Sequence, residues 1–149
     1  MKLSEMFSHW GQVRADLIKT LDTFQTAELA YVPFEGSWSV GQIALHIADC
    51  EDNWLHGVVG AEIQPWIFYD IADYPTHEEI KRLLGKARER TVNLLAKFTL
   101  EDFDRRYELP QGQTLPLGWI IWHVLEHEIH HRGELSFILG TLGREGLDV

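Results

Sequence analysis

Residues 114–139 read TLPLGWIIWHVLEHEIHHRGELSFIL, and this stretch decides the fold that the sequence predicts. Its apolar residues follow a helical period, with few alternating, strand-like runs. Pro116 falls in the first turn of the expected helix, where the missing amide of proline costs little. Gly140 and Gly143 follow the run and are typical of helix ends. We therefore expect a long helix from Thr114 to Leu139.

A second long helix is expected near the N-terminus, over Ser4–Ala30. Pro33 and Gly36 then break the helical pattern. Steps of three and four residues separate the apolar residues of this segment, so they form one stripe along a helix. The stripe consists of Met6, Trp10, Val13, Leu17, Leu21 and Phe24.

Two further helices begin at recognisable caps. Ser39 followed by Gln42 fits a capping box, in which each of two side chains bonds an otherwise unpaired amide. The helix that begins there, near Ser37 or Ser39, carries an apolar pattern as far as Val58. Thr76 and Glu79 fit a second capping box at the start of another amphipathic segment.

The connections complete the predicted architecture. About fifteen residues, from Gly60 to Pro75, join the second helix to the third, which exceeds the usual length and predicts a segment that crosses the bundle or covers a site. Residues 99–113 are polar and read as a long turn with a hairpin-like portion. Four helices with apolar stripes predict an all-α fold, a four-helix bundle with a long crossover connection between helices 2 and 3. We expect a single domain over residues 1–149.

Charge and composition exclude several classes of protein. The 149 residues include 13 Lys and Arg against 23 Asp and Glu, a formal net charge of −10. This balance argues against binding to nucleic acid or to an anionic membrane surface. The basic residues between Lys81 and Arg90 are expected on the solvated face of a helix. The most apolar stretch, Pro116–Leu125, is too short to span a bilayer.

The sequence also favours a reducing compartment. Cys50 is the only cysteine, so no intrachain disulfide can form. The first residues, Met1–Trp10, include Glu5 and lack an apolar run, so we expect no signal peptide. The expected location is cytoplasmic.

Four of the eight histidines fall in one nine-residue stretch, 123–131, of the expected C-terminal helix. At 100° per residue, His123, His127 and His131 share one helix face, and His130 lies about 60° to the side of His127. Imidazoles one turn apart can both reach one metal ion at about 2.0–2.1 Å. Histidines that are hydrogen-bonded in the core are the alternative, although three in register beside apolar residues need partners, which a metal ion supplies.

A further metal ligand is expected from another helix, and His46 is the best candidate. It lies on an unusually polar stripe of the second helix, together with Gln42, Cys50 and Asn53. A histidine satisfied by hydrogen bonds in the core is again the alternative. The remaining three, His9, His56 and His77, are expected in surface or capping roles.

The string His127-Glu128-Ile129-His130-His131 matches the His-Glu-x-x-His motif of metalloproteases, but nothing else in the chain indicates a protease. For Glu128 the expectation is a solvated charge. Cys50, one turn after His46, is expected to behave as a small buried apolar residue rather than as a nucleophile.

Two stretches resemble the DinB-like (DinB/YfiT) family. Residues 37–47, SWSVGQIALHI, are similar to the start of its second helix, and residues 127–134, HEIHHRGE, are similar to its His-x-x-x-His-Arg-Gly-Gln signature. The resemblance covers nearly the whole chain and implies a four-helix bundle with a divalent metal held by three histidines. By position in the motifs, these ligands are His46, His127 and His131. Glu134 stands where the family more often has Gln, which leaves the role of that side chain open.

The resemblance also implies chemistry. Three imidazoles leave a coordination position open, which is the pattern of catalytic zinc sites. Imidazoles suit Zn²⁺ and Ni²⁺ equally. DinB-like relatives include transferases and isomerases that use low-molecular-weight thiols such as bacillithiol or mycothiol, so thiol transfer to a small electrophilic substrate is the leading hypothesis. A metal-dependent hydrolase, a non-catalytic metal-binding stress-response protein and a bundle without metal are the alternatives.

Neighbouring polar groups and the oligomeric state complete the expectations. The other nitrogen of each ligand imidazole needs a partner, and Asp49, Asn53, Glu126 and Glu128 are the nearest candidates by helical phase. The seventeen aromatic residues exceed what a core of this size needs, and the family resemblance favours dimers, so a homodimer is expected.

Overall fold

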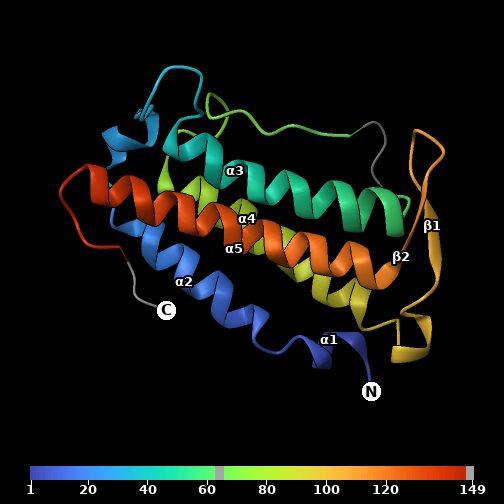
Figure 1. Cartoon of the computed structure of the whole chain (residues 1–149). Helices are drawn as coiled ribbons and strands as arrows, with labels where there is room; N and C mark the ends of the chain where they lie inside the picture. The colour runs from blue at the N-terminus through green and yellow to red at the C-terminus, as the bar shows by residue number, and fades with distance from the viewer. Residues whose placement is uncertain (63–65, 147–149) are drawn as a thin grey trace.

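The structure, a computed structural model, describes residues 1–62 and 66–146 and consists mainly of helices (Figure 1). Four of these helices are long and pack side by side, whereas the remaining elements are short. In chain order the elements are α1 (Leu3–Met6), α2 (Trp10–Asp22), the 3₁₀ helix η1 (Thr26–Ala30), α3 (Val40–Glu51), the π-helix η2 (Asp52–Val59), α4 (His77–Leu95), the 3₁₀ helix η3 (Leu100–Asp102), β1 (Arg106–Glu108), β2 (Thr114–Pro116) and α5 (Leu117–Thr141).

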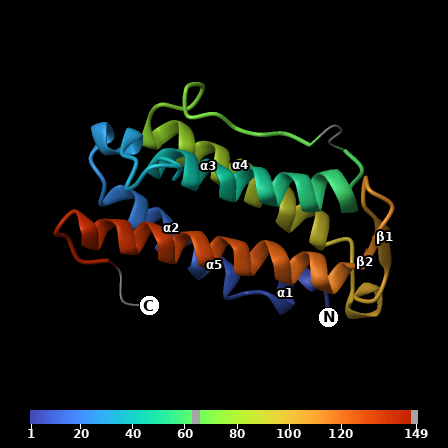
Figure 2. The same ribbon diagram turned by 45° about the horizontal axis from the view of Figure 1, so that its top comes forward.

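The four long helices form a bundle in which α3 and α4 run in one direction and α2 and α5 in the other (Figures 1 and 2). Helix α5 packs against α2 and α3, and α4 packs against the same two helices from the other side. Because α3 and α4 are parallel neighbours, the connection between them has to return along the length of the bundle. The all-α four-helix bundle and its crossover between the second and third long helices are therefore confirmed. Residues 63–65 of the crossover lie outside the described part of the chain.

The helix expected over Ser4–Ala30 is broken into three pieces, so this prediction of a continuous helix is wrong. The chain leaves the α-helix after Asp22, and Gln25 starts a new 3₁₀ turn, with its amide donating to Glu28 Oε2 at 2.7 Å. Phe24 and Leu29 are nevertheless buried. The apolar stripe therefore marks the residues that face the core, but the local capping group decides where the helix ends.

One of the two predicted capping boxes is complete in the structure, and the other is present only in part. Thr76 and Glu79 form the complete capping box at the start of α4. Ser39 caps α3 and accepts a hydrogen bond from the Gln42 amide at 3.2 Å. The side chain of Gln42 does not return to Ser39; it bonds instead to the backbone of Tyr69 and Ile71 in the crossover.

The C-terminal helix begins later than the sequence predicts. Residues 114–116 form β2, which pairs with β1 in an antiparallel two-stranded ribbon. Pro116 therefore ends a strand and stands as the N-cap of α5, not in its first turn. The Leu117 amide donates to the Arg105 carbonyl at 2.8 Å, so the ribbon itself fixes where the helix starts.

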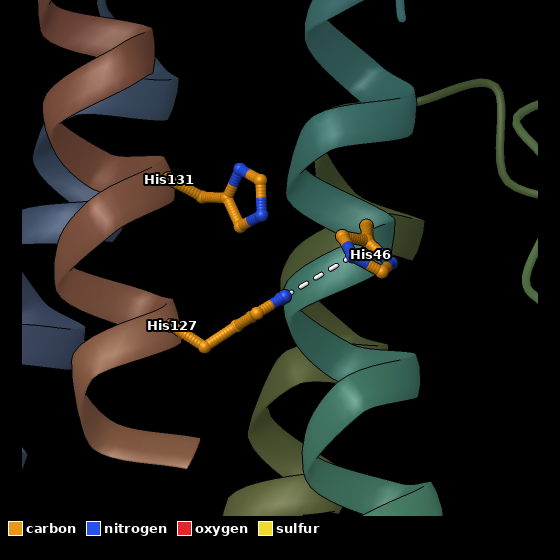
Figure 3. A group of neighbouring side chains, drawn as sticks. All are labelled: His46, His127 and His131. Atoms are coloured by element: carbon orange, nitrogen blue, oxygen red, sulfur yellow. Dashed lines mark hydrogen bonds between the residues drawn. The ribbon is translucent and has the colours of Figure 1, made fainter. Parts of the chain in front are cut away.

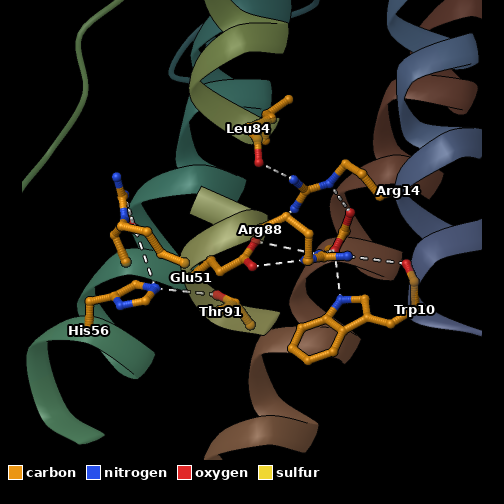
Figure 4. Close-up of polar contacts among 10 residues, drawn as sticks. Trp10, Arg14, Glu51, His56, Leu84, Arg88 and Thr91 are labelled. Atoms are coloured by element: carbon orange, nitrogen blue, oxygen red, sulfur yellow. Dashed lines mark hydrogen bonds and ion pairs between the residues drawn. The ribbon is translucent and has the colours of Figure 1, made fainter. Parts of the chain in front are cut away.

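The core consists of two apolar clusters, and a layer of buried charge lies between them along the helices. Each of the four long helices contributes one charged residue to this layer: Arg14, Glu51, Arg88 and Glu128. In every helix this residue lies between the part that packs in one cluster and the part that packs in the other. Figure 4 shows Arg14, Arg88 and Glu51 meeting between the helices.

The charged layer corrects several expectations. Glu128, expected to be solvated, is 1% exposed and accepts from Trp10 Nε1 at 2.9 Å and from Arg14 Nε at 2.5 Å. Arg88, expected on a solvated face, donates to Glu51 at 2.9 Å and also contacts Glu128. The cause is the same for both: their partners lie on other helices, so the local sequence does not reveal them.

Two histidines that were expected at the surface or in caps are also buried. His56 is 2% exposed, and its Nε2 lies 3.4 Å from the Thr91 hydroxyl (Figure 4). His77 begins α4 but is buried as well. Only His9, the exposed residue that precedes α2, has the predicted placement.

Candidate metal centre

Three histidines from two helices meet between α3 and α5. Figure 3 shows His127 and His131 pointing from α5 toward His46 on α3. One ring nitrogen of each histidine lies within 4.8 Å of those of the other two, and the Nε2 atoms of His46 and His127 are 3.1 Å apart. Two nitrogens bound tetrahedrally to one ion at 2.0–2.1 Å lie roughly 3.3 Å apart, so this pair already has nearly the separation that a shared ion requires.

Secondary structure explains why these side chains converge. His127 and His131 are one turn apart on α5, which places their ring centroids 4.5 Å from each other. Helix α3 runs antiparallel to α5 as its direct neighbour, and His46 lies on the side of α3 that faces α5 (Figure 3). The centroid of His46 lies 4.7 Å from that of His127 and 5.2 Å from that of His131.

Two carboxylates hold the outer nitrogens of this group. Asp49 Oδ1 lies 2.9 Å from His46 Nδ1, and Glu134 Oε2 lies 2.7 Å from His131 Nδ1. With Nδ1 donating its proton to a carboxylate, the Nε2 atom of each ring is left with a lone pair for a ligand. The open roles of Asp49 and Glu134 are thereby assigned in part, since each orients one imidazole.

His127 lacks such a carboxylate. Its Nδ1 is buried and has no hydrogen-bond partner among residues 1–62 and 66–146. Burial, together with the neighbouring His131 and His46, lowers the pKa of His127 to about 3. Burial also lowers the pKa of His131, against the opposing effect of Glu134. Both rings are therefore neutral at pH 7, which is the form that binds metal, so the donor set fits a divalent ion.

The neighbouring histidines are arranged differently. His123 stacks on Trp119, with centroids 4.9 Å apart and planes at 11°, and burial lowers its pKa. His130 is exposed and forms a second possible group with His131 and Glu134. Neither His123 nor His130 belongs to the group between α3 and α5, although His123 shares a helix face with two of its members.

The match to the metalloprotease motif has no structural counterpart. Glu128 points from α5 into the buried charged layer, where Arg14 and Trp10 bond it. It therefore faces away from His127 and is not placed to act as a base beside a metal ion. Glu126, another candidate for orienting an imidazole, lies 3.9 Å from His123 Nδ1 instead.

Cys50 and Asn53 share the face of α3 and η2 that is turned toward this group. Both line a cavity beside His46 and His127. Burial raises the pKa of the Cys50 thiol, which therefore stays protonated, as expected for a small buried apolar residue. Asn53, one of the candidate partners whose roles the sequence left open, bonds the backbone of the crossover rather than an imidazole.

A sequence model described as the DinB superfamily matches residues 9–135. The chain belongs to the DinB superfamily. This match spans α2, α3, α4 and most of α5 of the DinB bundle, including the three convergent histidines, and confirms the family that the two sequence motifs indicated.

Solved structures share this DinB fold. A DinB-like protein from Bacillus cereus has a TM-score of 0.79 at 20% identity, covering 99% of this chain and 97% of that one. YfiT from Bacillus subtilis, described as a probable metal-dependent hydrolase with an unusual four-helix bundle topology, has a TM-score of 0.57 at 23% identity, covering 88% and 86%. A mycothiol-dependent maleylpyruvate isomerase has a TM-score of 0.61 at 17% identity, covering 88% of this chain and 60% of that one.

At sequence identities of 17–23%, the likeness to these solved structures establishes the fold alone.

Within the described residues, no helix is both long and apolar enough to cross a membrane.

Proposed function

We propose that this DinB protein is a metal-dependent enzyme in which His46, His127 and His131 hold one divalent ion. The observation that carries the proposal is the convergence of three imidazoles, two of them oriented by Asp49 and Glu134. A metal bound at this site supplies Lewis acidity, which polarises an oxygen or sulfur group and lowers the pKa of an attached acid. Zn²⁺ and Ni²⁺ are the ions expected for an all-imidazole set.

An open coordination position supports catalysis over a structural role. Structural zinc sites are closed by four protein ligands, whereas this group has three. A cavity of about 530 Å³ lies directly beside His46 and His127, which leaves room for a substrate. Among the described residues, Cys50 is the one thiol in reach of the cavity and it stays protonated, so a sulfur nucleophile would have to come from a second small molecule.

We propose thiol transfer to a small electrophilic substrate as the reaction. The likeness in fold to a mycothiol-dependent isomerase supports this choice. The likeness to YfiT, described as a probable metal-dependent hydrolase, favours hydrolysis as the second candidate. A non-catalytic metal-binding role in stress response is the third. The chain's own histidines would bind the ion in all three cases, so the reactions have to be separated by substrate.

We also propose that the chain is a single domain, acts in the cytoplasm and forms a homodimer. Exposed apolar side chains along α5 support self-association, because a helix facing water usually carries polar residues there. These side chains are Trp119, Trp122, Ile129 and Phe137. Light scattering that finds a monomer at high concentration would contradict the dimer.

The test combines metal analysis with a substrate screen. The purified protein should contain one divalent ion per chain, and His127→Ala should lose it whereas His123→Ala keeps it. The metal-loaded protein is then offered electrophiles with and without a low-molecular-weight thiol, and hydrolysable esters and amides without one. Turnover that requires the thiol supports transfer; turnover of esters alone supports hydrolysis. A wild-type protein that binds no divalent ion would refute the proposal.

A further inference from the structure

The cavity beside the histidines has aromatic walls. Two of its residues, His46 and His127, belong to the proposed metal centre. Trp54 of η2 and His123 of α5 also line it. The crossover contributes Trp66, Ile67 and Phe68, and the Trp66 ring packs against that of Trp54.

Trp54 is the centre of this aromatic group. Its ring centroid lies 5.4 Å from that of Trp66, 5.5 Å from that of Trp119 and 4.9 Å from that of His123. All three rings are tilted steeply to Trp54, by about 60–70°. Edge-to-face rings at such distances stabilise one another and would accept one more flat ring in the same manner.

Side-chain amides fix the crossover part of the wall. Asn53 Nδ2 donates to the Ile67 carbonyl at 2.8 Å, and the Ile67 amide donates to Asn53 Oδ1 at 2.8 Å. Gln42 bonds Tyr69 and Ile71 in the same two-sided way. Ile67 lies between Trp66 and Phe68, so these bonds fix the backbone that carries the two exposed rings. A wall that is already ordered does not lose further conformational entropy when a ligand binds.

The charge of the cavity selects against an anionic ligand body. Among the described residues that line it, none is Lys or Arg, and the one acidic residue, Asp49, is buried and bonded to His46. A carboxylate or phosphate on the part of a ligand that lies against Trp54 and Phe68 would lose its hydration without gaining a cation. An uncharged aromatic group would lose little and would gain ring contacts.

We propose that this cavity binds the flat, uncharged aromatic body of the substrate, with the polar group of that substrate directed at His46 and His127. The inference rests on the proposed function, because it assigns a substrate class to the same centre. Trp54, Trp66 and Phe68 are the residues that set this preference. They act by contact with the ligand body and take no part in holding the ion.

Two hydroxamates that differ only in their body test the preference. Benzohydroxamate and acetohydroxamate carry the same metal-chelating group, so the ratio of their Kd values, measured by calorimetry on the metal-loaded protein, isolates the contribution of the phenyl ring. Benzohydroxamate should bind about tenfold more tightly, as expected from one or two aromatic contacts. The double variant Trp66→Ala/Phe68→Ala should lose most of this ratio, while its affinity for acetohydroxamate stays the same.

A matched control is available outside the cavity. Phe34 is an exposed phenylalanine that does not line the cavity, so Phe34→Ala removes a similar side chain and should leave the ratio unchanged. Trp54→Leu, which keeps an apolar side chain in the packed part of the wall, should lower the ratio without loss of the fold. A wild-type ratio near one, or a ratio that the cavity variants and Phe34→Ala affect equally, would overturn the proposal.

A second probe separates this inference from the proposed function. Naphthalene-2-methanol is uncharged and needs no metal ion, and its binding to chelator-treated protein can be followed by ligand-observed NMR. One outcome is that the protein binds no divalent ion but does bind this probe, and that Trp66→Ala/Phe68→Ala weakens probe binding whereas Phe34→Ala does not. The proposed function then fails, but the aromatic cavity is confirmed as a binding site. If the probe does not bind and the hydroxamates are not distinguished, the inference is wrong whatever the metal content.

Discussion

Arg14 on α2 donates to Glu128 on α5 at 2.5 Å, and with this contact the charged layer joins residues that are 114 positions apart. Arg14 also donates to Glu51 at 2.8 Å and to the Leu84 carbonyl at 2.6 Å, so it bonds all three of the other long helices. Burial lowers the pKa of this guanidinium, but Glu51 and Glu128 outweigh that effect and raise it, so Arg14 is always charged. The interior of the bundle is thus organised around a cation with two anionic partners.

Removal of this cation should destabilise the protein strongly. Arg14→Ala leaves two buried carboxylates to share the single cation of Arg88, and removal of one member of a buried ion pair costs about 3–5 kcal/mol. Chemical denaturation of wild type and variant gives the difference. Lys81→Ala, which breaks the exposed pair with Asp22, is the matched control and should change the free energy of unfolding by less than about 1 kcal/mol. Equal losses in the two variants would show that the charged layer has no special role.

The same layer predicts acid sensitivity. Burial raises the pKa of Glu51, but Arg88 and Arg14 outweigh it and lower this pKa from 4.5 to about 2. A carboxyl with a lowered pKa in the folded state adds stability that is fully present above pH 4.5 and is lost as the pH falls toward 2. The free energy of unfolding should therefore fall by on the order of 3 kcal/mol from this group across that range.

The variant Glu51→Gln tests whether the Glu51 carboxyl causes this acid sensitivity. It should be less stable than wild type at pH 7, because Arg14 and Arg88 lose a charged partner. Its stability should also change less between pH 5 and pH 3. Denaturation curves at a series of pH values measure both effects. A variant with the full acid dependence of wild type would assign the titration to other carboxyls.

Metal removal should lower thermal stability through the three histidines. An ion that binds only the folded protein stabilises it, by about 4 kcal/mol when its free concentration is 1,000 times Kd. A chelator should therefore lower the Tm of wild type and of His123→Ala alike. His127→Ala and His131→Ala should have a lower Tm without chelator and little further response to it. A Tm that no chelator changes in wild type contradicts the metal centre.

The carboxylates behind the imidazoles should tune metal affinity. Asp49→Ala removes the group that orients His46 and should weaken metal binding by about 10–100-fold, as measured by competition with a chromogenic chelator. Glu134→Gln keeps an oxygen acceptor for His131 Nδ1 and should cause a smaller loss. Glu126→Ala, which alters only the neighbourhood of His123, serves as the control and should leave the affinity unchanged.

Asn53 provides a test of the ordered crossover. Asn53→Leu removes both hydrogen bonds to Ile67, so the Ile67 amide should exchange with deuterium faster than in wild type. The amide of Leu117 bonds the Arg105 carbonyl and not the crossover, so it should exchange at its original rate and serves as an internal reference. Unchanged exchange at Ile67 would show that the crossover is held by other contacts.

Much of the fold and the composition of the candidate site follow from local patterns. The apolar period located the four long helices, and the interval of four residues placed His127 and His131 on one face of α5. The fold class and the family are confirmed by the structure and by the DinB superfamily match. The assignment of His46, His127 and His131 as metal ligands stays a prediction, although the three side chains do lie together.

What the sequence did not reveal depends on contacts between distant segments. Glu128 and Arg88 have no local partner and so resemble surface charges, yet each is bonded by another helix. Gln42 appeared to complete a cap, but the crossover offers it two backbone groups. Pro116 looked like a first-turn proline because nothing nearby in sequence indicates that β1 pairs with it.

The parallel course of α3 and α4 has a consequence for how this protein can diversify. Because the chain must return along the bundle, one wall of the cavity is a connecting segment, whereas the histidines stand on helices that the charged layer ties together. Substitutions at residues 66–68, which line the cavity, can reshape what it accepts, whereas Tyr69 and Ile71 pack on the helical core and should be kept. The residues that set ligand preference are thereby separate from the helices that hold the three histidines. A library of variants confined to this short segment is therefore the natural starting point for redirecting the protein to new ligands.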